Sequence, residues 1–290
     1  MRDMTILSPM RVGNEPWWTV KDELPLGKAI SWCVESKQVA NRRPVYIKEL
    51  RRSLLKFSVG RESLDISSIS PADIEDYFKD SKFSIRTRET QMSRLGALFS
   101  WAERRGLIQF NPVRRLDRIA IDHPPPRILT PQEADRLLMF SENRQPKLFG
   151  YVVIGLFAGV RPDELAKLEW SAVDTERALL TIDSAASKTR RRRVVPLHPK
   201  AVHWILKVKD RRGPIVSCNR PHQLQRLAMW MGWEEWPKDV LRKTCASYLL
   251  ELHQDAGKVS TWMGHTQTVL YRHYRELVRP EDCAAFWSTA

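Results

Sequence analysis

Cysteine is scarce in this chain of 290 residues, and the four that it has are scattered. Cys33, Cys218, Cys245 and Cys283 form no CxxC pair. The sequence therefore lacks both the ligand spacing of a zinc site and the framework of a disulfide-rich secreted domain. We expect reduced thiols and no metal site.

Long apolar runs are missing as well. No stretch approaches the length that crosses a bilayer, and Met1 to Pro16 lack the basic-then-apolar pattern of a signal peptide. We therefore expect a cytoplasmic protein that does not act at a membrane. No internal repeat is evident.

Acidic residues are outnumbered by basic ones. The chain holds 48 Lys and Arg against 34 Asp and Glu, for a formal net charge of +14. Such an excess indicates a polyanionic partner, with nucleic acid first and an anionic membrane second. The length suffices for two ordinary domains that each bury a core.

A run of three prolines marks the clearest boundary. Pro124, Pro125 and Pro126 cannot continue a helix and favour an extended connector. A capping box then restarts a helix, with Thr130 as the cap and Glu133 three residues later. We predict an irregular arm over residues 1–24, a helical domain over 25–121, a linker over 122–128 and a second domain over 129–290.

The first domain is predicted to hold four helices. The spacing of its apolar residues places them at about 26–37, 44–59, 71–78 and 85–105. The early turns of the fourth helix carry Arg86, Arg88 and Arg94, which we predict to contact nucleic acid. The alternative is a solvated basic face on a helical bundle.

The second domain mixes element types. Two short strands are expected at about 178–183 and 193–197, and a last short helix at about 281–287 is expected either to dock on a neighbouring protomer or to pack on its own domain. The predicted fold is mainly α with a small β-hairpin or sheet. The other helices are predicted at about 131–143, 148–158, 162–168, 199–208, 221–231, 239–254, 257–263 and 269–277.

Basic side chains recur where the chain turns in this domain. Arg161 lies between the glycine that ends one helix and the proline that opens the next, with Glu164 one turn on to hold its guanidinium. Lys188 belongs to a hairpin tip that also carries Arg190, Arg191 and Arg192, which suit contacts with backbone phosphates. The alternatives are an ordinary surface ion pair and a basic loop.

Five short motifs in a fixed order give these residues a common meaning. They are G-x-R-x-x-E-L from Gly159, Lys188 ahead of V-P-L, L-R-x-T-x-A-S around Arg242, then G-H at Gly264 and His265, and Tyr274 nine residues beyond that histidine. In this set the chain resembles the tyrosine recombinase (phage integrase) family. The resemblance covers the whole chain in layout, because the family joins a small helical core-binding domain to a mixed α/β catalytic domain.

The resemblance implies a phosphoryl transfer that uses no metal or nucleotide cofactor. Tyr274 is then the nucleophile that forms a 3′-phosphotyrosyl link with double-stranded DNA, and Lys188 protonates the leaving oxygen. Arg161 and Arg242 would hold the non-bridging oxygens, and His265 would stabilise the phosphate. Cations held at those oxygens stabilise the charge that gathers in the transition state.

One position departs from the family pattern. The family usually has His or Lys three residues before the second arginine, and this chain has Asp239. Three interpretations are open: Asp239 caps the following helix, it acts as a base, or the enzyme is slow or partly degenerate. A carboxylate close to a phosphate is otherwise repulsive.

Two rival functions share parts of this pattern. One is a catalytically impaired DNA-binding relative, for which Asp239 is the only support. The other is a topoisomerase that nicks and reseals DNA without paired sites. The leading prediction is a site-specific recombinase or integrase of a mobile element, with a homotetramer on paired DNA sites and DNA-bending accessory proteins as partners.

Overall fold

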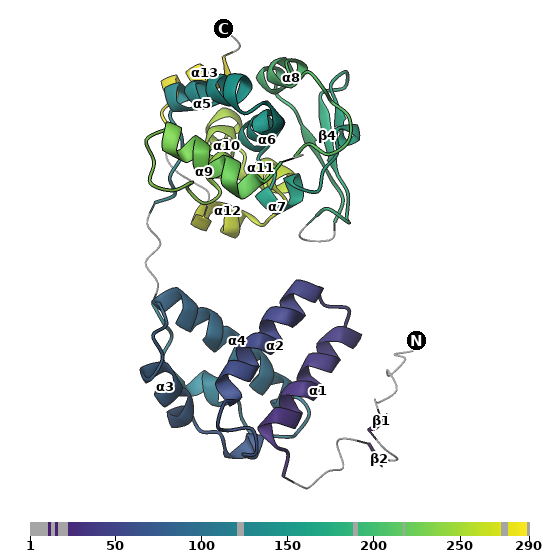
Figure 1. Ribbon diagram of the computed structural model, residues 1–290, viewed down its shortest axis with the longest axis vertical. Coiled ribbons are helices and arrows are strands. Elements are labelled where there is room, and N and C mark those ends of the chain that lie inside the picture. Colours follow the sequence, from purple (N-terminus) through teal and green to yellow (C-terminus); the bar gives the residue numbers. More distant parts are fainter. Residues whose placement is uncertain are drawn as a thin grey trace. The chain divides into compact units, whose positions relative to one another are not determined.

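The computed structural model describes residues 11–12, 15–16, 23–120, 125–187, 191–216, 218–273 and 278–288. The chain falls into two compact units, residues 1–123 and 124–290 (Figure 1). Most of the predicted arm and the first part of the predicted linker lie outside the described residues. Within the arm, β1 (Arg11–Val12) and β2 (Glu15–Pro16) pair as a short antiparallel ladder, where irregular chain was expected.

The first unit is helical, as its sequence predicts. Local signals set the helix starts: the Ser70 hydroxyl and the Asp73 carboxylate form a reciprocal capping box, and Ser84 caps the fourth helix. The helices are α1 (Leu26–Val39), α2 (Pro44–Ser58), α3 (Pro71–Lys79) and α4 (Ile85–Glu103), with short 3-10 segments at Ile66–Ser68 and Pro112–Arg115.

An apolar core joins α1, α2 and α4. Leu50, Leu54 and Phe57 lie on one face of α2 and are fully buried against the neighbouring helices. The opposite face of α2 carries Arg51 and Arg52, which are exposed. The helix therefore buries its apolar stripe and presents cations to solvent, as its helical periodicity requires.

The second unit packs helices around one central helix (Figure 1). Every residue of α6 from Leu148 to Ala158 is buried, and α5, α8 and α10 all contact it. The helices are α5 (Pro131–Arg144), α6 (Pro146–Ala158), α7 (Pro162–Leu165), α8 (Pro199–Leu206), α9 (Arg220–Trp230), α10 (Val240–His253), α11 (Ala256–Met263), α12 (Gln267–His273) and α13 (Pro280–Trp287). No helix among the described residues is long and apolar enough to span a membrane.

A small antiparallel sheet lies beside the helices, in the order β3–β4–β5. The two predicted strands are confirmed as β4 (Leu179–Ile182) and β5 (Arg193–Pro196), with Ile182 opposite Arg193 next to the connecting turn. The sequence pattern missed β3 (Val173–Asp174), which is too short to show a period. The sequence also predicted α7 to continue to about residue 168. The helix ends at Leu165, and the Leu168 carbonyl accepts a hydrogen bond from the Ile215 N–H.

The last helix, α13, packs on its own unit. The Phe286 ring stacks on Tyr248 of α10 with a centroid separation of 4.0 Å, and Trp287 Nε1 donates to the Tyr248 carbonyl at 3.3 Å. The two alternatives for this helix were docking on a neighbouring protomer and packing on its own domain. In the structure it packs on its own domain. Its aromatic side chains are buried together with Cys283.

Candidate active site

Arg161 is held where α6 gives way to α7. Gly159 ends α6 with a φ of 58°, and a Cβ there would lie 2.6 Å from Met263 Sδ, so the tight turn requires glycine. Arg161 Nη1 then donates to Glu164 Oε1 at 3.1 Å, as expected, and its Nη2 donates to the Gly264 carbonyl at 2.6 Å. The side chain is 14% exposed, so the guanidinium faces a partly open site.

Arg242 reaches the same place from α10. It is 1% exposed, and its Nη1 donates to the Gly159 carbonyl at 2.5 Å while Nη2 donates to the Met263 carbonyl at 2.7 Å. The guanidinium thus lies at the carbonyl end of α11, where the helix dipole favours a cation.

Arg193 is a third arginine in the cluster, and no sequence motif had assigned it a role. Its Nη2 donates to Glu164 Oε2 at 2.6 Å, and its Nε donates to the Trp262 carbonyl at 3.1 Å. Its side chain is 9% exposed. A charged residue so deeply buried needs partners such as these. In the sequence, Arg193 stands directly after the basic turn. That position did not distinguish a residue of the site from an ordinary strand residue.

The three arginines converge on the turn that precedes His265. The carbonyls of Trp262, Met263 and Gly264 each accept a hydrogen bond from a different arginine of the cluster. The last carbonyls of a helix have no partner within the helix, and cations stabilise them. Three separate elements are thereby held at one helix end.

His265 lies among these cations. Burial lowers its pKa to about 3, and the positive charges of Arg242, Arg161 and Arg193 act in the same direction. The imidazole is therefore neutral at pH 7 in the DNA-free protein. An anion brought between the arginines would oppose their effect and raise this pKa.

Asp239 occupies the position before the first residue of α10, but it does not cap the helix. Its side chain accepts no capping hydrogen bond, and its backbone is left-handed with a φ of 57°. The capping interpretation is therefore wrong. Asparagine, aspartate and histidine all tolerate this backbone region better than most residues, so the conformation accounts for a short polar residue here.

Two predicted catalytic residues, Lys188 and Tyr274, lie outside the described residues, as does Arg190. The described chain ends at Ser187 before the basic turn and resumes at Arg191. It follows α12 from Gln267, two residues after His265, to His273 next to Tyr274 in sequence. The structure therefore brings together Arg161, Arg242 and His265, and the roles of all five stay predictions.

The arginines predicted to contact DNA differ in their surroundings. Arg86 and Arg191 are exposed, and the Arg192 side chain is 67% exposed at 3.6 Å from Asp183. Arg94 lies 3.6 Å from Glu49 of α2. Arg88 is half-buried, and its Nε has no hydrogen-bond partner among the described residues.

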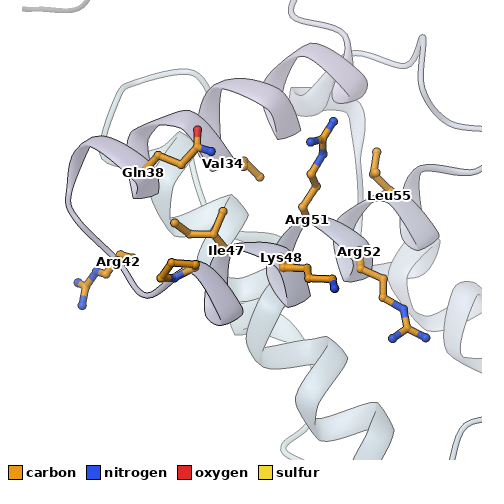
Figure 2. Close-up of a pocket in the computed structure, with 9 residues that line it drawn as sticks. Val34, Gln38, Arg42, Ile47, Lys48, Arg51, Arg52 and Leu55 are labelled. Atoms are coloured by element: carbon orange, nitrogen blue, oxygen red, sulfur yellow. The ribbon is translucent and has the colours of Figure 1, made fainter. Parts of the chain in front are cut away.

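A basic groove between α1 and α2 was not singled out from the sequence. Figure 2 shows the side chains that line it, which come from α1, from α2 and from the turn between them. The groove has a volume of about 740 Å³. Its charged lining residues are all cations and include no carboxylate. The lining comprises Val34, Gln38, Arg42, Pro44, Ile47, Lys48, Arg51, Arg52 and Leu55.

Comparison with known proteins identifies a family. The family model described as "Phage integrase family" matches residues 127–279, which is more than half of the chain and includes the whole arginine cluster. A tyrosine recombinase of Thermosipho africanus is 27% identical over 257 residues, covering 80% of this chain and 88% of the relative. The tyrosine recombinase XerD of Neisseria meningitidis serogroup A is 26% identical over 214 residues, covering 64% and 72%.

Solved structures show the same fold. The Tn1549 transposon integrase, in complex with a circular intermediate DNA, aligns with a TM-score of 0.69 at 17% identity, over 90% of this chain and 98% of that one. A lambda integrase dimer bound to a core site aligns with a TM-score of 0.69 at 18% identity, over 87% and 96%. On its sequence and its fold, the chain belongs to the phage integrase family, the tyrosine recombinases.

Proposed function

We propose that this protein is a site-specific recombinase that cleaves and rejoins double-stranded DNA through a 3′-phosphotyrosyl intermediate. The observation that carries the proposal is the convergence of Arg161, Arg242 and His265 on one turn, at the start of the segment that leads to Tyr274. A partly buried cluster of fixed cations is suited to a phosphate whose negative charge grows in the transition state.

The chemistry assigns one role to each residue. The Tyr274 phenol gives up its proton to water or to a nearby base, and its oxygen attacks the scissile phosphorus. The bond from phosphorus to the 5′ oxygen breaks, and Lys188 gives a proton to that oxygen. The products are a 3′-phosphotyrosine and a free 5′-hydroxyl. A 5′-hydroxyl, usually from a second duplex, reverses the attack. The phosphotyrosine keeps the energy of the broken bond, so the reaction needs neither metal nor nucleotide.

The contacts of the arginines are compatible with a phosphate at the same place. A guanidinium has five N–H donors in a fixed fork, so it can bind a backbone carbonyl and a phosphate oxygen together. Arg161, with its partly exposed side chain, would meet the phosphate from the solvent side. The buried Arg242 would meet it from the core.

The first unit supplies the second part of the proposal. We assign residues 25–121 to DNA binding and residues 129–290 to catalysis, with 122–128 as the linker. The cations of the α1–α2 groove, together with Arg86, Arg88 and Arg94, suit contacts with the DNA backbone. Arg190, Arg191 and Arg192 would add contacts from the basic turn of the catalytic unit.

The proposed reaction also implies an assembly. Exchange of strands between two duplexes requires a protomer at each cleaved strand, which leads us to a homotetramer on paired sites. DNA-bending accessory proteins would help to bring such sites together. The protein would act in the cytoplasm, on the DNA of a mobile element.

Covalent capture tests the proposal without knowing the target in advance. The protein is incubated with sheared genomic DNA from its source organism, and the DNA linked covalently to it is purified and sequenced. We expect enrichment of one or a few discrete sites, each joined through its 3′ phosphate. Adducts scattered without a site would indicate a DNA-relaxing enzyme instead, and the absence of any adduct would contradict the proposed chemistry.

A further inference from the structure

Arg193 is the member of the arginine cluster that the proposed chemistry leaves without a task. It is the first residue of β5, so it stands where the basic turn carrying Lys188 returns to the sheet. Its side chain nevertheless leaves the sheet and is buried against α7 and α11. The guanidinium binds a carboxylate of α7 and a carbonyl of α11. Arg193 therefore connects β5 to both helices.

The contacts of Arg193 fall on two different partners. Nη2 binds Glu164, whose other oxygen holds Arg161, and Nε binds the Trp262 carbonyl three residues before His265. The Glu164 side chain is 1% exposed, so both of its arginine contacts lie out of bulk water. Hydrogen bonds between charged groups are stronger and more directional in such surroundings.

Close packing fixes the same side chain from a third direction. Gly264 has a φ of 67°, and a Cβ on it would lie 3.1 Å from Cδ, Nε and Cζ of Arg193. The left-handed backbone favours glycine here, and an added Cβ would press on the Arg193 side chain. The position of β5 relative to the turn before His265 is set by this contact together with the two hydrogen bonds.

We propose that Arg193 is a positioning residue that sets the hairpin carrying Lys188 in register with the Arg161, Arg242 and His265 cluster. The inference rests on the proposed function, since it concerns how the proposed acid meets the phosphate held by the cluster. Arg193 itself needs no contact with DNA. A small displacement of a catalytic group lowers a rate steeply, by about 100-fold for a shift of about 1 Å.

The test uses a DNA substrate that makes the acid unnecessary. In a nicked duplex of the captured site, sulfur replaces the bridging 5′ oxygen at the scissile phosphate. A thiolate leaves without being protonated, so this substrate does not require a correctly placed Lys188. The same duplex with oxygen is the reference, and the single-turnover rate of covalent adduct formation is measured for both.

Three variants make the result specific. R193A removes the guanidinium, R193K keeps a buried positive charge while losing the planar fork, and R177A removes an arginine from the β3–β4 turn that is 81% exposed. With the oxygen substrate we expect R193A to be slower by about 100-fold, R193K to be intermediate and R177A to match the parent protein. With the sulfur substrate we expect R193A and R193K to recover most of the deficit.

The outcomes separate this inference from the proposed function. Equal deficits of R193A and R193K on both substrates would show that Arg193 acts on the phosphate cluster or on folding alone, and would overturn the inference. So would an R193A protein with the parent rate on the oxygen substrate. If the parent protein forms no adduct with either substrate, the proposed function fails, and the inference fails with it.

Discussion

At the scale of single residues, two arginines of the cluster differ in burial, and removing them should therefore have different costs. Arg242 is 1% exposed and satisfies two carbonyls, whereas the Arg161 side chain is 14% exposed and shares its carboxylate with Arg193. Burial of a carbonyl without a partner carries a penalty in folding free energy. Both residues are proposed to hold the same phosphate.

We expect R161A and R242A each to slow cleavage by about 100-fold to 1,000-fold, because each removes charge stabilisation that the transition state needs. R242A should also lower the free energy of unfolding by about 2 kcal/mol or more, since it removes the donor to the Gly159 carbonyl at the end of α6 and to the Met263 carbonyl at the end of α11. R161A should lower it less. Urea unfolding and single-turnover cleavage measure the two effects, and equal decreases in stability would contradict the role assigned to burial.

Asp239 is the second residue whose role the structure narrows. Its side chain makes no capping bond, so two interpretations remain: Asp239 acts as a base, or it makes the enzyme slow. We expect D239H to raise the cleavage rate, because an imidazole removes the carboxylate's repulsion of the phosphate and can still take a proton. D239N, which is neutral but cannot take the proton, separates the two effects. A D239H protein slower than the parent would instead identify Asp239 as a base.

At the scale of elements, the contact between α6 and α10 is closer than side chains normally permit. A Cβ on Gly155 would lie 2.8 Å from Leu241 Cδ1, one residue before Arg242. We expect G155A to lower the free energy of unfolding by about 1–3 kcal/mol through overpacking. G96A in α4 is the matched control, since its Cβ would make an ordinary 3.7 Å contact with Val113 Cγ1.

For that control we expect an increase in the free energy of unfolding of about 0.5–1 kcal/mol, because alanine loses less backbone entropy than glycine on folding. Chemical denaturation of both variants makes the comparison. A neutral or stabilising G155A would show that the two helices can separate without cost. Such a result would contradict the close packing of α6 against α10.

The elements also show what the sequence could and could not predict. Helix starts followed from local chemistry, as with the capping box at Thr130 and Glu133, which is present as expected. The end of α7 and the strand β3 could not be predicted from local chemistry. They depend on hydrogen bonds between distant segments, such as the one from Ile215 N–H to the Leu168 carbonyl. Arg161 and Arg242 stood out because they belong to ordered motifs. Arg193 did not, since its burial depends on contacts with segments distant in sequence.

At the scale of the whole molecule, the question is which surface with part of the net charge of +14 would bind DNA. Lys48, Arg51 and Arg52 line the α1–α2 groove, with no carboxylate among its lining residues (Figure 2). Binding of cations to DNA phosphates releases counterions, so log affinity falls as log salt rises. Removing one cation that binds a phosphate should make the slope of this plot less negative by about 0.9. Such cations position DNA without reading its sequence.

We therefore expect K48Q/R51Q/R52Q to weaken binding to duplex DNA of random sequence at low salt and to flatten its salt dependence. The cleavage rate of the fully bound complex should stay near that of the parent. K207Q/K209Q/R212Q removes the same charge from the second unit, where Arg212 is 91% exposed, and is the control for net charge. An equal change of slope in both triple variants would mean that overall charge, and not the groove, accounts for binding.

The most direct measurement of the central claim is the identity of the residue linked to DNA. A nicked duplex of the captured site is incubated with the parent protein, with Y274F and with Y271F, and the adduct is digested and mapped by mass spectrometry. We predict a phosphotyrosine at Tyr274 joined to a 3′ DNA end, no adduct with Y274F despite unchanged DNA binding, and a normal adduct with Y271F. An adduct that survives in Y274F and is absent in Y271F would contradict the account.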